Sequence, residues 1–120
     1  MVSFKVLIVD DDYINRKLLV SILKKELYKI EAIESIDGED ALKKLKTHPD
    51  IQLILLDIEM PNVNGLEFLE RYHQDIRLKR VRTIAISSND LHKKRAIEAG
   101  SHAFLVKPIT EEKLMEAILG

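Results

Sequence analysis

Residues 53–61 read LILLDIEMP, so four aliphatic residues run directly into a carboxylate at Asp57. An apolar run of this length, bounded by turn residues, predicts a β-strand that is buried on both faces. Pro61 and Gly65 follow, which indicates that the chain leaves the sheet through a loop just after Asp57. Ligands bind beyond the carboxyl ends of strands in an open parallel sheet. An isolated Asp at such a place more often makes a turn or caps a helix, so the ends of the other strands decide its role.

The rest of the chain alternates short apolar runs with segments of helical periodicity. Apolar residues at steps of three and four indicate helices. Ile14, Leu18 and Ile22 step by four, with Leu19, Leu23 and Leu27 beside them, and these residues are expected to form the apolar face of the first helix. Residues 77–82 are expected to form a basic loop. The pattern predicts strands over residues 5–9, 30–36, 53–56, 83–86 and 103–106, and helices over residues 14–27, 41–47, 65–72, 91–99 and 111–118.

Five strands that alternate with five helices predict an α/β fold. The strands would form a parallel sheet with helices on both faces, joined by right-handed crossovers. A chain of 120 residues suits one domain. We expect residues 1–120 to form that domain, with no room for an output domain.

Composition excludes several classes of protein. The sequence has no cysteine, so it can form no disulfide, thiolate metal site or thiol nucleophile. Lys and Arg total 19 and Asp and Glu total 20, which argues against a dedicated nucleic-acid-binding domain. No apolar run approaches the roughly 18–20 residues that span a bilayer, and the first residues lack the features of a secretory signal. We therefore expect a cytoplasmic protein that binds neither nucleic acid nor membrane.

Four of the five predicted strands end in residues that can take part in chemistry. The first strand ends in Asp10 and Asp11, the third in Asp57, the fourth in Ser87 and the fifth in Lys107. These side chains are expected to converge, because the carboxyl ends of parallel strands meet at one edge of the sheet. Clustered carboxylates repel one another unless a cation lies among them, and oxygen-only ligands favour Mg²⁺. A lysine and a hydroxyl beside such an ion suit phosphoryl oxygens, and a carboxylate can itself accept a phosphoryl group.

The chain resembles the receiver domain of two-component response regulators over essentially its whole length. The resemblance implies a flavodoxin-like (βα)5 doubly wound sheet with strand order 2-1-3-4-5, as in chemotaxis regulators. It depends on four motifs that occur in order at the spacing of the family: Val9-Asp10-Asp11, then Leu56-Asp57 with Met60-Pro61 and Gly65, then Ile86-Ser87, and finally Val106-Lys107-Pro108.

The resemblance also implies which residues accept phosphate and hold a metal ion. Asp57 would be the phosphoacceptor. Asp11, Asp57 and the backbone carbonyl of Glu59 would bind Mg²⁺, or Mn²⁺ in its place, and Asp10 would help through a water molecule. The side chain of Glu59 would flank the pocket, where it could affect the lifetime of the phosphoryl group.

Three further residues complete the implied site. Ser87 and Lys107 would bind the phosphoryl group, and the peptide bond between Lys107 and Pro108 would be cis. Phe104 occupies the position of the family's switch aromatic, which is often Tyr. Ser87 and Phe104 would therefore carry the switch, without the hydroxyl of a tyrosine.

The implied function is that of a signalling module that catalyses its own phosphorylation and dephosphorylation. The phosphoryl donor would be a histidine kinase or a histidine phosphotransfer protein. A downstream protein would bind the face made by the predicted helix 91–99, strand 103–106 and helix 111–118.

Two other interpretations remain open from the sequence. A small phosphohydrolase would use Asp57 as its nucleophile and Glu59 as its acid–base, but the chain offers no cap domain and carries an additional acid pair. A degenerate receiver would bind partners without phosphorylation, and the complete set of pocket residues argues against this. A dinucleotide-binding domain is excluded, because the first strand is followed by acidic residues and not by a Gly-rich loop. Asp12, the last of these, is expected to cap the first helix.

Overall fold

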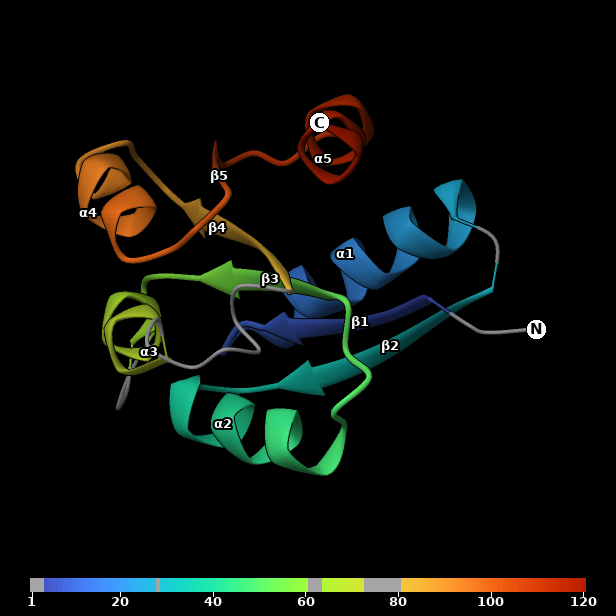
Figure 1. Ribbon diagram of the computed structural model, residues 1–120. Coiled ribbons are helices and arrows are strands. Elements are labelled where there is room, and N and C mark those ends of the chain that lie inside the picture. Colours follow the sequence, from blue (N-terminus) through green and yellow to red (C-terminus); the bar gives the residue numbers. More distant parts are fainter. Residues whose placement is uncertain (1–3, 28, 61–63, 73–80) are drawn as a thin grey trace.

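Figure 1 shows five parallel strands in one twisted sheet, with helices on both of its faces. The computed structural model describes residues 4–27, 29–60, 64–72 and 81–120. The strands follow the order β2-β1-β3-β4-β5, which confirms the predicted doubly wound α/β fold. No helix in these described ranges is long and apolar enough to cross a bilayer. In chain order the elements are β1 (Phe4–Val9), α1 (Tyr13–Glu26), β2 (Ile30–Ser35), α2 (Gly38–Thr47), β3 (Leu53–Asp57), α3 (Gly65–Tyr72), β4 (Arg82–Ser87), α4 (Lys93–Glu98), β5 (Ala103–Val106) and α5 (Glu111–Leu119).

The central strands are buried because both faces of the sheet are covered. Val6 and Ile8 of β1 belong to the core cluster beneath α1 and α5, whereas Leu7 and Val9 belong to the cluster beneath α2, α3 and α4. The same alternation makes all five residues of β3 buried. Each fully buried aliphatic side chain contributes roughly 1.5–3 kcal/mol relative to its exposed state. The central aliphatic runs therefore fix the sheet, and with it the position of Asp57.

The two outer strands of the sheet are less buried than the central ones. No residue of β5 is fully buried, and β2 buries only Ser35. Glu34 of β2 instead accepts hydrogen bonds from Arg16 Nε at 3.0 Å and Lys17 Nζ at 2.6 Å. The helices cover both faces of this edge strand in part: Ile30 and Ala32 pack against one core cluster and Ile33 against the other, which explains the imperfect alternation of residues 30–36.

Short polar side chains fix the helix starts, and the cap at Asp12 was expected. Asp12 accepts hydrogen bonds from the backbone N–H groups of Ile14 and Asn15, so it caps α1. Thr110 caps α5 by accepting from Lys113 N at 3.1 Å. The helix α2 begins earlier than residue 41, because the side chain of Asp37 accepts from the backbone N–H of Asp40.

The predicted burial of Ile14 and Leu18 is wrong. These side chains are 74% and 50% exposed, and the buried face of α1 is made by Leu19, Ile22 and Leu23. With 3.6 residues per turn, each step of four residues rotates the side chain about 40° around the helix axis. Two such steps separate Ile14 from Ile22, so Ile14 has turned away from the sheet.

The boundaries of α4 and β4 also differ from expectation. The helix α4 is shorter than residues 91–99, because the side chain of Asn89 accepts from the backbone N–H of Leu91 at 3.0 Å and makes a turn. The strand β4 begins at Arg82, whose backbone N–H donates to Gln52 O. Arg82 was expected to end the basic loop, and residues 77–80 of that loop lie outside the described residues.

Gly65 allows α3 to start directly against the end of β3. A Cβ atom at this position would lie 2.5 Å from the Cα of Ile58 and 2.6 Å from the carbonyl oxygen of Asp57. Both neighbours are backbone atoms, so they cannot move aside as the end of a flexible side chain could. The glycine therefore sets the distance between α3 and the chain that follows Asp57.

We expect Gly65→Ala to destabilise the protein by about 1–3 kcal/mol, the usual cost of inserting atoms into a packed contact. Urea denaturation monitored by circular dichroism measures this loss. Glu67→Ala is the control, because Glu67 is exposed on the same helix and should change stability by about 0.5 kcal/mol or less. Wild-type stability in Gly65→Ala would show that the backbone contact can relax without cost.

Candidate functional site

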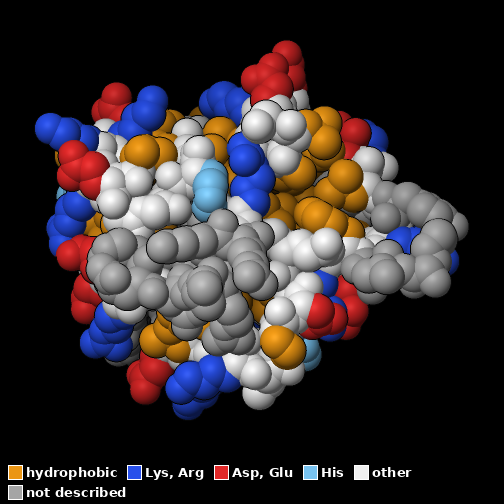
Figure 2. All heavy atoms as spheres, in the orientation of Figure 1, with side chains coloured by type: hydrophobic (Ala, Val, Ile, Leu, Met, Phe, Trp, Pro, Cys, Tyr) orange, Lys and Arg blue, Asp and Glu red, His pale blue; other side chains and the backbone are white. Residues whose placement is uncertain are grey.

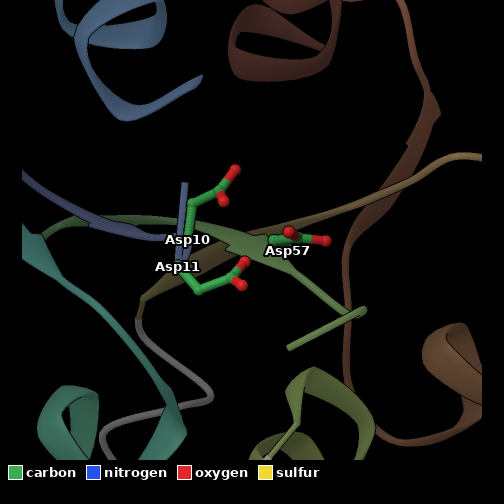
Figure 3. A group of neighbouring side chains, drawn as sticks. All are labelled: Asp10, Asp11 and Asp57. Carbon is green, nitrogen blue, oxygen red and sulfur yellow. The ribbon is translucent and has the colours of Figure 1, made fainter. Parts of the chain in front are cut away.

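Three aspartates meet at the carboxyl edge of the sheet. One carboxylate oxygen each from Asp10, Asp11 and Asp57 lies within 4.8 Å of the other two. Figure 3 shows the first two extending from the end of β1 and the third from the end of β3. Asp10 and Asp57 are 2% and 3% exposed, whereas Asp11 is open to solvent. The structure thus brings together the acidic residues that the sequence analysis singled out.

Backbone contacts orient the two buried carboxylates. The backbone N–H of Asp12 donates to Asp10 Oδ1 at 2.8 Å, and that of Glu59 donates to Asp57 Oδ1 at 3.0 Å. The guanidinium of Arg16 donates to the backbone carbonyl of Asp10 at 2.8 Å. The other oxygen of Asp57, Oδ2, lies 3.7 Å from Lys107 Nζ. Each buried carboxylate therefore has one oxygen fixed by the backbone and a second that faces the edge of the sheet.

The groups around the three aspartates do not fully stabilise the negative charge of the cluster. Burial, with a further contribution from the neighbouring Asp10, raises the pKa of Asp57 to about 6, even though the Glu59 N–H and Lys107 act to lower it. Burial also raises the pKa of Asp10. Oxygen ligands at these separations suit a hard divalent cation, and a cation would relieve the repulsion.

Ser87 and Lys107 lie at the ends of the next two strands. Ser87 is fully buried at the end of β4, and its carbonyl oxygen accepts from the backbone N–H of Lys107 at 2.8 Å. The peptide bond between Lys107 and Pro108 is cis, as the resemblance implied. Phe104 of β5 is partly buried and packs against the core cluster beneath α2, α3 and α4.

The side chain of Glu59 makes contacts that the sequence analysis missed. Its carboxylate accepts from Ser87 Oγ at 2.9 Å, from Ser88 N at 2.6 Å and from Ser88 Oγ at 2.9 Å. These hydrogen bonds, led by the one from the Ser88 N–H, hold the pKa of Glu59 below its usual range. Two adjacent serines at the end of one strand, opposite a carboxylate that follows the neighbouring strand, were the available signal in the sequence.

A cavity of about 450 Å³ opens beside the carboxylates, between α1 and the segment that joins β5 to α5. Its walls combine polar groups of the site with aliphatic side chains. Figure 2 shows hydrophobic side chains gathered on the surface over the region between α1 and α5, while charged side chains of both signs are interspersed elsewhere on this face. The lining residues are Asp10, Asn15, Leu18, Leu19, Ile86, Ser88, Lys107, Pro108 and Ile109.

Comparison with protein families identifies one match that spans nearly the whole chain. Residues 6–119 match the model of the response regulator receiver domain. The two-component response regulator ORR11 of Oryza sativa subsp. indica is 32% identical over 106 residues, which cover 87% of this chain and 71% of that protein.

The chain is also similar to a segment of a histidine kinase. The signal transduction histidine-protein kinase BarA of Escherichia coli is 32% identical over 119 residues, which cover 98% of this chain and 13% of the kinase. Among solved structures, a chain in the crystal structure of the CheX–CheY–BeF3–Mg complex from Borrelia burgdorferi superimposes with a TM-score of 0.85 and 34% identity. That match covers 97% of this chain and 87% of the other.

The raised pKa of Asp57 predicts how this residue affects stability. Its pKa is about 6 in the folded state against an ordinary value of 3.8, so folding favours the protonated form. The stabilising contribution is full below pH about 4 and is lost as the pH rises through about 6. We expect metal-free Asp57→Asn to be more stable than wild type at pH 7, by on the order of 1–3 kcal/mol.

Urea denaturation in the presence of a chelator, at pH 7 and at pH 4, measures this effect. The advantage of Asp57→Asn should shrink at pH 4, where the wild-type carboxyl is protonated in the folded state. Asp50→Asn is the control, because Asp50 is an exposed carboxylate paired with Lys5 and should gain no stability at pH 7. Equal stability of Asp57→Asn and wild type at both pH values would contradict the prediction.

Proposed function

Because the chain belongs to the response regulator receiver family, we propose that it accepts a phosphoryl group on Asp57 within a two-component phosphorelay. The donor would be a histidine on a kinase or on a phosphotransfer protein. The observation that carries this proposal is the buried Asp57 carboxylate, which has Lys107 Nζ 3.7 Å from one oxygen and two further aspartates beside it. Receiver domains are signalling modules, and self-catalysed phosphorylation and dephosphorylation form part of the proposal.

The chemistry follows from the side chains that surround the acceptor. A carboxylate oxygen of Asp57 attacks the phosphorus atom, the bond from phosphorus to the donor histidine nitrogen breaks, and an aspartyl phosphate forms. Phosphoryl transfer depends mainly on positioning and on neutralising the phosphoryl oxygens. Lys107 supplies positive charge and Ser87 a hydroxyl donor, both from strand ends next to the acceptor.

The residues present also fit a divalent cation. Asp10, Asp11 and Asp57 would hold Mg²⁺, or Mn²⁺, together with the backbone carbonyl of Glu59. When bound, the ion supplies positive charge that neutralises the acidic cluster and the phosphoryl oxygens. The high pKa of Asp57 supports this assignment, because a cation at the cluster would favour the ionised, nucleophilic form.

The surface beside the acceptor suits a protein donor. The cavity at the site has Leu18, Pro108 and Ile109 among its walls, and Tyr13 and Ile14 are 63% and 74% exposed on the adjoining first turns of α1. An exposed apolar patch beside a reactive group is typical of a binding surface for another protein. We propose that the donor docks here and presents its histidine to Asp57.

The output surface is proposed to lie on α4, β5 and α5. Phosphoryl oxygens on Asp57 would draw the hydroxyl of Ser87 toward them, and Phe104 would turn into the space that this movement leaves. Phe104 is only partly buried, so it has exposed area to lose. A change worth about 1 kcal/mol shifts a two-state population several-fold. A downstream protein would recognise the altered face.

The phosphohydrolase alternative is weakened by the position of Glu59. A general acid must carry a proton at the working pH, but the hydrogen bonds from Ser88 and Ser87 lower the pKa of Glu59. The degenerate-receiver alternative differs from our proposal in one observable property, the phosphorylation of Asp57.

We expect Mg²⁺ to stabilise the wild-type protein, by about 1.4 kcal/mol at a concentration ten times the dissociation constant. A thermal-shift series in MgCl2 or MnCl2 measures the effect. Asp11→Asn should lose most of the response. Asp12→Asn is the matched control, because Asn also caps helices well and Asp12 is outside the three-carboxylate cluster. If the melting temperature of Asp11→Asn rose with Mg²⁺ as much as that of wild type, the three-aspartate cluster would not be the metal site.

We expect acetyl phosphate with Mg²⁺ to add one phosphoryl group to the wild-type protein and none to Asp57→Asn. Intact-mass spectrometry detects the added group. Asp50→Asn removes an exposed carboxylate that precedes β3, at the opposite end of this strand from Asp57, and should be modified like wild type. An unmodified wild-type protein would favour the degenerate receiver, and a phosphate on Asp57→Asn would identify another acceptor.

A further inference from the structure

The Glu59 carboxylate links the loop after β3 to the loop after β4. The backbone N–H of Glu59 donates to Asp57 Oδ1 at 3.0 Å, while the side chain of Glu59 extends to the end of β4. There Oε1 accepts from Ser87 Oγ at 2.9 Å and from Ser88 N at 2.6 Å, and Oε2 accepts from Ser88 Oγ at 2.9 Å. We call this set of contacts among Glu59, Ser87 and Ser88 the Glu59 bridge.

We propose that the Glu59 bridge opposes phosphorylation: it holds the hydrogen-bond donors of Ser87 and Ser88 in the unphosphorylated protein and must break when Asp57 carries a phosphoryl group. This inference depends on the proposed function, since it names a residue that regulates the same site. Glu59 acts through its carboxylate on Ser87, so it is a positioning residue and not a catalytic one.

The side chain of Ser87 has only one proton to donate. A serine hydroxyl donates a single hydrogen bond at a time, and in this structure that bond goes to Glu59. Ser87 is fully buried, so solvent does not compete for its hydroxyl. A phosphoryl oxygen on Asp57 can therefore gain the Ser87 donor only if the bond to Glu59 is lost.

Phosphorylation also increases the negative charge beside Glu59. An aspartyl phosphate carries about −1.5 to −2 charges at neutral pH in place of the single charge of the ionised carboxylate, and Glu59 follows Asp57 by two residues with its backbone N–H held on the Asp57 carboxylate. The added charge repels the Glu59 carboxylate and competes for its donors. Phosphorylation therefore weakens the bridge both by competing for its donors and by charge repulsion. The free energy needed to break the bridge is added to the free energy of the phosphorylated state.

The bridge also has a physical connection to α4. Asn89 follows the two serines, and its backbone N–H donates to Ser87 Oγ at 3.4 Å. The side chain of Asn89 accepts from Leu91 N at 3.0 Å, just before α4 begins. These contacts form a continuous set of hydrogen bonds from Glu59 to the start of α4. Release of the bridge therefore frees the loop that leads into this helix.

The test compares two substitutions that differ in charge. Glu59→Ala removes the carboxylate, whereas Glu59→Asp keeps the charge but is one methylene too short to span the same distance. Neither change touches the backbone carbonyl of residue 59. Glu67→Ala, at an exposed position of α3, is the control. The affinity of each protein for beryllofluoride with Mg²⁺ is measured by titration with amide NMR, and the Ser88 amide proton is recorded before the mimic is added.

We expect both Glu59 variants to bind beryllofluoride about three- to tenfold more tightly than wild type, the range for losing one competing charge-assisted hydrogen bond at a partly exposed site. The Ser88 amide proton should move upfield in both variants, because it loses its carboxylate acceptor. Glu67→Ala should match wild type in both measurements.

Each other outcome has a distinct meaning. Tighter binding in Glu59→Ala with wild-type binding in Glu59→Asp would show that charge alone is responsible, and would overturn the bridge. Equal binding by all four proteins would overturn it as well while leaving the proposed function intact. Failure of wild type and every variant to bind beryllofluoride would overturn the proposed function and the inference together.

Discussion

The burial of Asp57 at the end of β3 is the constraint on which the site depends. All five residues of this central strand are covered by helices on both faces. Covering the strand stabilises the fold, but it also removes the terminal carboxylate from water. A buried charge is costly unless it is paired or coordinates a metal ion. The surroundings of Asp57 stabilise its charge only in part, through one backbone N–H and an ammonium group at 3.7 Å.

Because these two groups do not fully stabilise the buried charge, the pKa of Asp57 is raised and the site favours binding of a cation. Asp10 is buried beside Asp57, and burial raises the pKa of both carboxyls, while Asp10 raises the pKa of Asp57 further. A fold selected only for stability would replace one of them with a neutral side chain. Two buried carboxylates side by side therefore lower the stability of the ion-free protein, and a cation between them would restore it.

The sequence predicted the architecture and the converging residues well, for identifiable reasons. The aliphatic runs that end in Asp10, Asp57 and Ser87 are strong signals, because a parallel sheet leaves few alternatives for them and brings its strand ends together. Details of helix faces were harder. The apolar face predicted for the first helix was too wide: Leu19, Ile22 and Leu23 are buried as expected, but only the packing of α1 on the sheet shows that Ile14 and Leu18 are not.

Contacts between side chains of different loops were harder to predict. The sequence places Ser87 and Ser88 after the strand next to that of Asp57, but it does not give the distance from these serines to the carboxylate of Glu59, which accepts their hydrogen bonds. Similarly, the start of α4 depends on a turn made by the side chain of Asn89, and helical periodicity alone does not reveal it. These features depend on distances between loops, which are set only once the sheet has formed.

The order of the strands has a consequence for how the chain is made on the ribosome. The strands β1 and β3 are neighbours in the sheet, although the whole of α1, β2 and α2 separates them in sequence. The ammonium group beside Asp57 arrives later still, on Lys107, after β5 has been synthesised. A nascent chain can therefore bring Asp10 and Asp57 together once β1 and β3 have been made, yet it lacks the ammonium group beside Asp57 until β5 and Lys107 have followed. The negative charge of the three aspartates thus precedes this cation in synthesis, and only the completed five-stranded sheet brings the charges together.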